Sequence, residues 1–226
     1  LKIISEGGLG ADCVSGGEIE AAMRAGFPSN GIVFAGVGKA DWEINTALDA
    51  NIFCFNVESV PELEVINELA KAKGKTANVC FRINPEVGAH THANITTGLA
   101  ENKFGIAMSD MVPVIERALS LENINFTGLH FHIGSQITKI RRIQAALREA
   151  SQFYIQLHKM GYNVDFVDCG GGLGVDYDGT RSPSSESSVN YSIQEYVNDC
   201  IYTFVDAADK NNIAHPNIIT ESGRSL

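Results

Sequence analysis

Asp168-Cys-Gly-Gly-Gly-Leu-Gly174 is the stretch that decides the fold, because a short strand-like run ends there in a glycine-rich loop. Two further stretches follow the same plan, and they are His130-Phe-His-Ile-Gly-Ser-Gln136 and Glu221-Ser-Gly-Arg224. An α/β barrel builds its active site from the loops that follow the carboxyl ends of its strands. The three stretches therefore predict an α/β barrel whose strand ends form a pocket for a phosphate-bearing cofactor.

Strand-like and helical segments alternate along the chain. Runs rich in Val, Ile, Phe and Cys predict seven strands, at residues 11–14, 32–35, 52–57, 76–83, 126–132, 165–169 and 217–220. From Ile140 to Met160, apolar residues recur every three or four positions, which predicts one long amphipathic helix. Ser15 with Glu18 and Ser59 with Glu62 fit the capping box that begins a helix. Strict alternation predicts a parallel sheet, and the glycine-rich strand ends favour a (β/α)8 barrel over an open sheet.

The composition is that of an ordinary globular protein. Of 226 residues, 44% are hydrophobic and 19% are charged, so we expect residues 1–226 to form one domain around a large core. Asp and Glu number 27 against 17 Lys and Arg. The resulting formal charge of −10 disfavours nucleic acid as a partner.

Cysteine usage and hydropathy point to the cytoplasm. The five cysteines are widely spaced and include no CxxC pair, so neither a disulfide framework nor a structural zinc site is expected. No apolar stretch approaches the roughly 18 residues of a membrane helix, and no membrane partner is expected.

The glycines at 170–174 suit the binding of an anion. Residues without a Cβ let backbone amides approach a phosphate closely, so binding does not require a large positive charge. The alternative is a tight turn after a buried strand. The run is not a dinucleotide-binding fingerprint, because Val175 occupies the position of the last glycine.

Two histidines, His130 and His132, alternate on a predicted strand and should point to the same side of it. They could ligate a metal ion, or one imidazole could lie flat against a cofactor ring. A hydrogen-bonded core histidine is the simpler alternative for either. The Gly134-Ser135 pair that follows favours the cofactor, and no clear set of further metal ligands is found on later strands.

The last motif offers a carboxylate and a cation. Glu221 could hold a protonated ring nitrogen, while Arg224 and the amide of Gly223 approach a phosphate. An ordinary Glu–Arg surface pair is the alternative. Residues Asp12, Arg82 and Lys103 also lie at or near predicted strand ends, where structural ion pairs are an equal alternative to a functional role.

Taken together, these residues resemble the ornithine/diaminopimelate/arginine decarboxylase family, whose enzymes use pyridoxal 5′-phosphate and carry it on an α/β barrel. The resemblance runs through the whole chain. It implies that His132 stacks on the pyridine ring and that Glu221 pairs with the pyridine nitrogen. It further implies a phosphate site, to which it assigns Ser135, Gly170, Gly171, Gly172, Gly223 and Arg224. Asp12 and Arg82 match positions around the cofactor, and Lys103 matches a lysine near the dimer interface.

The resemblance also implies that parts of the enzyme lie outside the chain. The family's Schiff-base lysine is on the first barrel strand, just before Leu1, and its C-terminal β-domain supplies a catalytic cysteine. We therefore expect a truncated barrel without its first strand, no catalytic residue within the chain, and no turnover by the chain alone. A homodimer with shared active sites is the expected assembly.

Two subfamilies share the resemblance. Residues up to about Ser135 are similar to diaminopimelate decarboxylase, and residues from about Ile140 onward are similar to biosynthetic arginine decarboxylase. The expected reaction is decarboxylation of a basic amino acid, with meso-diaminopimelate giving lysine or, alternatively, arginine giving agmatine. Either a divergent natural enzyme or a composite of two genes would explain why the resemblance changes from one subfamily to the other along the chain.

Three other classes of protein compete with this interpretation. A metal-dependent hydrolase would need more ligands than His130 and His132. A racemase on the same barrel would not be expected to place a carboxylate such as Glu221 at the pyridine nitrogen. A non-catalytic homologue that regulates a decarboxylase is the alternative that is not an enzyme, and it should fail to form the Schiff base.

Overall fold

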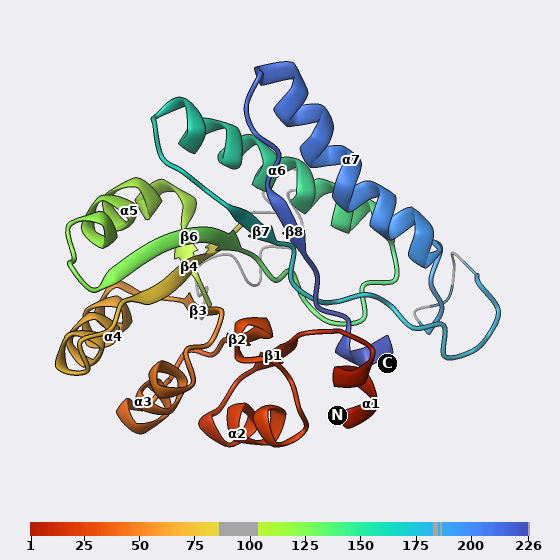
Figure 1. Cartoon of the computed structure of the whole chain (residues 1–226). Helices are drawn as coiled ribbons and strands as arrows, with labels where there is room; N and C mark the ends of the chain where they lie inside the picture. Colours follow the sequence, from red (N-terminus) through yellow and green to blue (C-terminus); the bar gives the residue numbers. More distant parts are fainter. Residues whose placement is uncertain (86–103, 183–184, 186, 226) are drawn as a thin grey trace. The chain divides into compact units, whose positions relative to one another are not determined.

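The structure is a computed structural model. It describes residues 1–85, 104–182, 185 and 187–225. Contacts within the chain define two compact units. Unit 1 comprises Leu1–Ile83 and Phe104–Thr127, and unit 2 comprises Asn84–Lys103 and Gly128–Leu226. Helices and strands alternate along the chain in both units (Figure 1).

Unit 1 is built on parallel strands in the order β1-β2-β3-β4, with β5 beside β4. Its strands are β1 (Ala11–Cys13), β2 (Ile32–Phe34), β3 (Cys54–Val57), β4 (Ala77–Asn84), β5 (Ile106–Ala107) and the first half of β6 (Ile124–His130). Its helices are α1 (Lys2–Glu6), α2 (Gly16–Arg24), α3 (Asp41–Ala50), α4 (Val60–Ala72) and α5 (Met111–Leu119), with short 3-10 turns at Ser29–Gly31 and Met108–Asp110.

Unit 2 contains the second half of β6, followed by strands β7 (Phe166–Asp168) and β8 (Asn217–Ile219). The order is β6-β7-β8, and both pairings are parallel. Its two long helices are α6 (Ile140–Lys159) and α7 (Ile193–Asn211), and a 3-10 turn spans Gly223–Ser225. Helices α6 and α7 lie side by side in Figure 1 and pack against each other.

The seven predicted strands are all present, as is the long helix predicted from Ile140. Observed bounds differ from the predicted ones by one or two residues. Strand β5 was missed, because two residues carry no readable period. Parallel strands that alternate with helices confirm the predicted α/β class.

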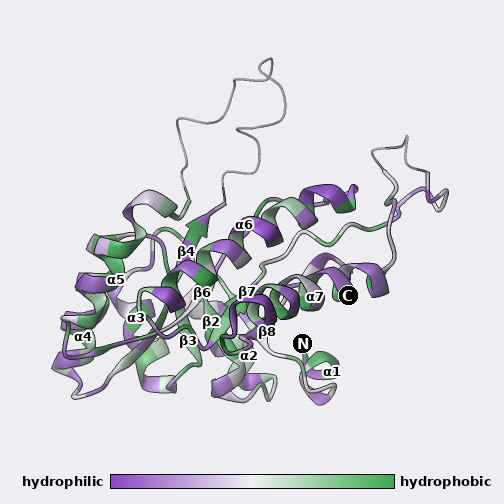
Figure 2. Ribbon diagram, turned by 90° about the horizontal axis from the view of Figure 1, so that it is seen from above, coloured by the Kyte–Doolittle hydropathy of each residue, from purple (hydrophilic) through white to green (hydrophobic). Residues whose placement is uncertain are grey.

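The core of each unit is aromatic and aliphatic. In unit 1, the rings of Phe81 and Phe126 stack with centroids 5.3 Å apart. In unit 2, Tyr154 of α6 meets Phe204 of α7 edge to face, and its hydroxyl donates to the carbonyl of Ala214 at 2.8 Å. Figure 2 shows hydrophobic colour on the strands and mixed colour on the helices. Among the described residues, no helix is long and apolar enough to cross a membrane.

Helix starts follow the capping prediction only in part. Ser15 and Ser59 each accept a hydrogen bond from the amide three residues on, as predicted. The carboxylate of Glu62 accepts from the amide of Glu58, one residue before the serine, so the reciprocal box is not formed there. Glu18 likewise accepts from Val14. A complete box is formed where none was predicted, at Ser192 and Glu195 of α7.

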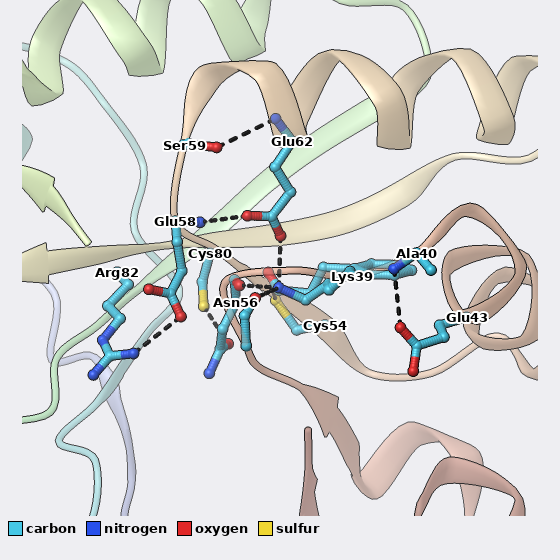
Figure 3. A network of polar contacts seen from close by, with 12 residues as sticks. Lys39, Ala40, Glu43, Cys54, Asn56, Glu58, Ser59, Glu62, Cys80 and Arg82 are labelled. Carbon is cyan, nitrogen blue, oxygen red and sulfur yellow. Dashed lines mark hydrogen bonds and ion pairs between the residues drawn. The ribbon is translucent and has the colours of Figure 1, made fainter. Parts of the chain in front are cut away.

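A buried lysine ties three parts of unit 1 together (Figure 3). The ammonium of Lys39 donates to the carbonyls of Gly36 and Asn56, both at 2.8 Å, and lies 2.5 Å from the carboxylate of Glu62. Its side chain is only 1% exposed. Because these partners follow β2, lie in β3 and begin α4, Lys39 fixes the loop after β2 against the next strand and helix.

A second ion pair lies beside the first in Figure 3. Arg82 of β4 donates to Glu58 at 3.0 Å, and the amide of Gly105 donates to the other oxygen of that carboxylate at 3.2 Å. The guanidinium also lies 4.7 Å from the centroid of the Phe104 ring. In unit 1, Arg82 therefore takes the structural role that sequence reasoning left open.

We expect Lys39→Met to lower the free energy of unfolding by about 3–5 kcal/mol, because it leaves the Glu62 carboxylate buried without its cation. Adding Glu62→Gln should recover much of the loss. Urea unfolding measures both. The control is Lys73→Met, which breaks the exposed pair with Asp49 and should cost less than about 1 kcal/mol. Equal losses for Lys39→Met and Lys73→Met would contradict the expectation.

Candidate functional site

The parallel register of unit 2 brings three strand ends side by side. His130 pairs with Asp168, and Asp168 pairs with Ile219. The ladder continues past the strands, because the amide of Glu221 donates to the carbonyl of Gly170 at 3.0 Å. Glu221 therefore lies beside Gly170, at the same edge of the sheet as His130 and Asp168.

A carboxylate lies between two imidazoles at these strand ends. Nε2 of His130 is 3.4 Å from Oε1 of Glu221, and Nδ1 of His132 is 3.8 Å from Oε2. The side chain of His130 is 3% exposed, that of Glu221 is 16% exposed and that of His132 is 32% exposed. Both histidines thus face one group, as their alternation predicted, and Glu221 faces them rather than forming the surface pair that was the alternative.

A second carboxyl group, Asp168, joins this cluster. It is buried, and its Oδ1 accepts a hydrogen bond from the amide of Gly170 at 2.9 Å. Ligand atoms of His130, Asp168 and Glu221 all lie within 4.8 Å of one another, so the three also offer the donor types of a metal site. Sequence reasoning missed this grouping. The signal was the position of Asp168 at a strand end, two residues before the first glycine.

The two carboxyl groups of the cluster differ in their proton affinity. Burial alone would raise the pKa of Glu221, but the neighbouring imidazoles of His130 and His132 outweigh it and hold that pKa well below its usual range. Burial raises the pKa of Asp168 to about 6, with His130 opposing and Glu221 adding to the shift. Near neutral pH the negative charge is therefore more firmly held on Glu221 than on Asp168.

Two of the loop glycines are required by the backbone. Gly170 has φ +66°, and a Cβ there would lie 2.1 Å from the carbonyl oxygen of Phe131. Gly172 has φ +100°, and its Cβ would lie 2.4 Å from the carbonyl oxygen of Gly134. Because backbone oxygens cannot yield as side chains do, these two glycines allow the loops after β6 and β7 to lie against each other.

The glycine between them has a different surrounding. A Cβ on Gly171 would lie 3.4 Å from Cε1 of His132 and 3.5 Å from Oε2 of Glu221, which is ordinary contact. The fold does not need a glycine there. The absence of a side chain instead leaves space beside the imidazole and the carboxylate.

Arginine and hydroxyl groups gather at the edge of the same site. Nε of Arg224 donates to Oγ of Ser135 at 3.1 Å, and its Nη1 donates to the hydroxyl of Tyr177 at 3.1 Å. Arg224 and Gly223 are exposed in the 3-10 turn that follows Glu221. The predicted neighbours Ser135 and Arg224 are thus brought together. Tyr177 was not predicted, because nothing in its local sequence marks it.

Side-chain hydrogen bonds lock the two loops together. The amide of Gln136 bonds both the amide and the carbonyl of Val175, at 3.0 and 2.7 Å. The hydroxyl of Tyr191 accepts from the amide of Gly174 at 2.9 Å and donates to the carbonyl of Ile137 at 2.6 Å. These contacts fix the loop that carries Ser135.

Three predicted residues lie apart from this site. Asp12 and Arg82 belong to unit 1, whose position relative to unit 2 is not determined, so their predicted place around a cofactor stays a prediction. Lys103 lies outside the described residues. All other predicted site residues are in unit 2, around Glu221 and the loops after β6, β7 and β8.

Comparison with protein families gives a match over the whole chain. The family model described as "Pyridoxal-dependent decarboxylase, pyridoxal binding domain" matches residues 1–226. Unit 2 contains chemical groups that fit such a cofactor: a carboxylate, an imidazole, a glycine without a side chain beside both, and an arginine in contact with hydroxyl groups.

Curated relatives carry both of the names that the resemblance predicted. The chain is 65% identical over 177 residues to a diaminopimelate decarboxylase of Bacteroides thetaiotaomicron, covering 78% of the chain and 46% of that protein. It is 49% identical over 234 residues to a biosynthetic arginine decarboxylase of Phocaeicola vulgatus, covering 100% of the chain and 37% of that protein. The chain spans half or less of the length of these relatives.

Solved structures show the same fold. Two crystal structures of diaminopimelate decarboxylase from Methanocaldococcus jannaschii, one in co-complex with L-lysine, match with a TM-score of 0.88 and 40% identity. They cover 100% and 99% of this chain, which corresponds to 50% of each solved chain. The match confirms the predicted α/β barrel class.

We expect the free energy of unfolding of Asp168→Asn to increase relative to that of wild type as pH rises from about 4 to about 6. Burial raises the pKa of Asp168 in the folded protein to about 6, above the ordinary value of 3.8, so the folded protein binds this proton more tightly than the unfolded chain. Wild type therefore loses stability as pH rises over this range. Asparagine does not titrate. Urea unfolding at several pH values measures the difference between the free energies of the two proteins.

Asp178→Asn is the matched control for this measurement. Asp178 is exposed, and hydrogen bonds from Ser185 and Thr180 lower its pKa. The difference in free energy of unfolding between Asp178→Asn and wild type should therefore not rise over the same range. A flat or falling difference for Asp168→Asn would contradict the assigned proton affinity.

Proposed function

Because the chain belongs to the pyridoxal-dependent decarboxylase family, we propose that residues 1–226 form the pyridoxal phosphate-binding domain of an amino-acid decarboxylase. The observation that carries the proposal is the Glu221 carboxylate, held between His130 and His132 at the ends of parallel strands. A carboxylate kept ionised there is the group that a protonated pyridine nitrogen requires.

Glu221 and His132 would hold the ring. Glu221 accepts the hydrogen bond of the ring nitrogen, and its lowered pKa keeps it an acceptor throughout the neutral range. His132 is partly exposed and supports one face of the ring. Gly171 supports this assignment, because its missing side chain leaves space beside both groups.

The phosphate would be bound at the edge of the site. Arg224 supplies positive charge and Ser135 a hydroxyl donor, and the two already contact each other. The backbone of Gly172 and Gly223 would supply amide donors. Gly170 and Gly171, whose amides donate to Asp168 and His132 in this structure, would keep bulky side chains away from the phosphate. Local binding of this kind suits a protein whose net charge is −10.

Bound pyridoxal phosphate supplies an electron sink for the electron pair left when the substrate loses CO2. The residues of this chain orient the ring, hold the phosphate and keep a negative charge at the ring nitrogen, which favours the protonated and more electron-withdrawing form. The expectation that residues 1–226 alone do not turn over stays a prediction.

The substrate proposed first is meso-diaminopimelate, with lysine as product. Support comes from the 65% identical relative and from the solved diaminopimelate decarboxylase in co-complex with L-lysine. Arginine, giving agmatine, is the second candidate, because the arginine decarboxylase relative matches 100% of the chain and the first relative 78%. A homodimer, a cytoplasmic location and cofactor contacts from Asp12 and Arg82 complete the proposal.

The proposal predicts that the complete protein releases CO2 from meso-diaminopimelate or arginine in the presence of pyridoxal phosphate, whereas residues 1–226 alone do not. Gly171→Ala should weaken cofactor binding by about tenfold or more, because its methyl group enters the ring site. Released CO2 and cofactor fluorescence measure the two effects.

Gly17→Ala is the control, since a Cβ at that exposed helix position meets nothing closer than 4.0 Å. It should bind the cofactor as wild type does. A complete protein that binds pyridoxal phosphate but decarboxylates neither substrate would support the regulatory homologue instead. One that binds no pyridoxal phosphate would overturn the proposed function.

A further inference from the structure

His130 and Asp168 have no role in the proposed binding of the cofactor, yet both are buried against Glu221. His130 is 2% exposed and Asp168 is 1% exposed, so neither belongs to the open part of the site. Burying an ionisable group costs free energy unless the group is paired or hydrogen-bonded, so the neighbours of these two residues matter. Their common neighbour is the carboxylate that faces the ring nitrogen.

We propose that His130 and Asp168 are positioning residues that act through Glu221, fixing its carboxylate in place and keeping the negative charge on it. The inference rests on the proposed function. His130 does this from the buried side, where its Nε2 lies 3.4 Å from Oε1 of Glu221. Asp168 does it because it is the carboxyl group of the cluster that takes up a proton first.

The argument for His130 is geometric. It approaches Oε1 of Glu221 at 3.4 Å, while the more exposed His132 lies 3.8 Å from Oε2. His130 ends β6, where pairing with β7 fixes its backbone, and the burial of its side chain restricts movement of the ring. A rigid donor behind a carboxylate fixes the direction in which the other oxygen is presented.

The argument for Asp168 concerns charge. Two carboxyl groups this close do not both ionise without cost, and the proton stays on the one with the weaker set of donors. Asp168 is anchored by the amide of Gly170 and cannot turn away from the cluster. Glu221 has two imidazole neighbours, so it is the group that keeps the charge.

The test compares two ligands on the apo form of the complete protein. One ligand is pyridoxal phosphate, and the other is its 1-deaza analogue, in which a C–H replaces the ring nitrogen. Wild type should bind pyridoxal phosphate about tenfold or more tightly than the analogue, since only the former has a ring N–H for Glu221. Glu221→Gln should lose this preference.

His130→Phe should lose the preference as well. It should weaken the binding of pyridoxal phosphate about tenfold and keep the affinity for the analogue within about threefold of the wild-type value. Asp168→Asn should keep it, because an amide can donate to Glu221 as a protonated acid does and can still accept from Gly170. Where His130→Phe does not fold, His130→Asn is judged by the same criterion. The control is His158→Phe, which replaces a histidine of α6 that packs edge-on against Tyr154, and it should change neither affinity.

Three results would overturn the inference while leaving the proposed function intact. The first is a His130 variant that weakens both ligands equally, as a merely structural residue would. The second is an Asp168→Asn variant that loses the preference. The third is a preference that disappears with EDTA and returns with Zn²⁺, since the cluster would then be a metal site. Failure of wild type to bind either ligand would instead overturn the proposed function.

Discussion

The contact between Glu221 and the two histidines is the interaction on which the site depends. A carboxylate that is 16% exposed stays ionised because imidazoles lie close to it, and the chain supplies them at and just after the end of β6. The parallel register of β6, β7 and β8 brings these groups together, because it sets His130 beside Asp168 and lets the ladder continue to Glu221. The strand pairing that builds the sheet therefore also determines which charged groups meet in the site.

Much of the fold could be predicted from local patterns. Short apolar runs and amphipathic spacing recur along the chain. They became strands and helices because the spacing of apolar residues determines which face of an element can be buried. The glycine loop was also foreseen, and the close approach of two backbones requires glycine at Gly170 and Gly172. No such steric need applies to Gly171, and a sequence pattern cannot separate it from its neighbours.

The unpredicted contacts are those between residues far apart in the chain. Asp168 lies near His130 only through strand register, and Tyr177 reaches Arg224 across 47 positions. In unit 1, Lys39 binds Glu62 across 23 positions, which draws a side chain expected to cap a helix into a buried ion pair. Such contacts depend on tertiary geometry, whereas sequence periods report only neighbours along one element.

The measurement that tests the central claim most directly is the ¹⁵N NMR chemical shift of pyridoxal phosphate labelled at its ring nitrogen and bound to the complete protein. A carboxylate held ionised at Glu221 predicts a protonated nitrogen across the neutral pH range and an unprotonated one in Glu221→Gln. An unprotonated nitrogen in wild type, or one that titrates identically in both proteins, would contradict the account.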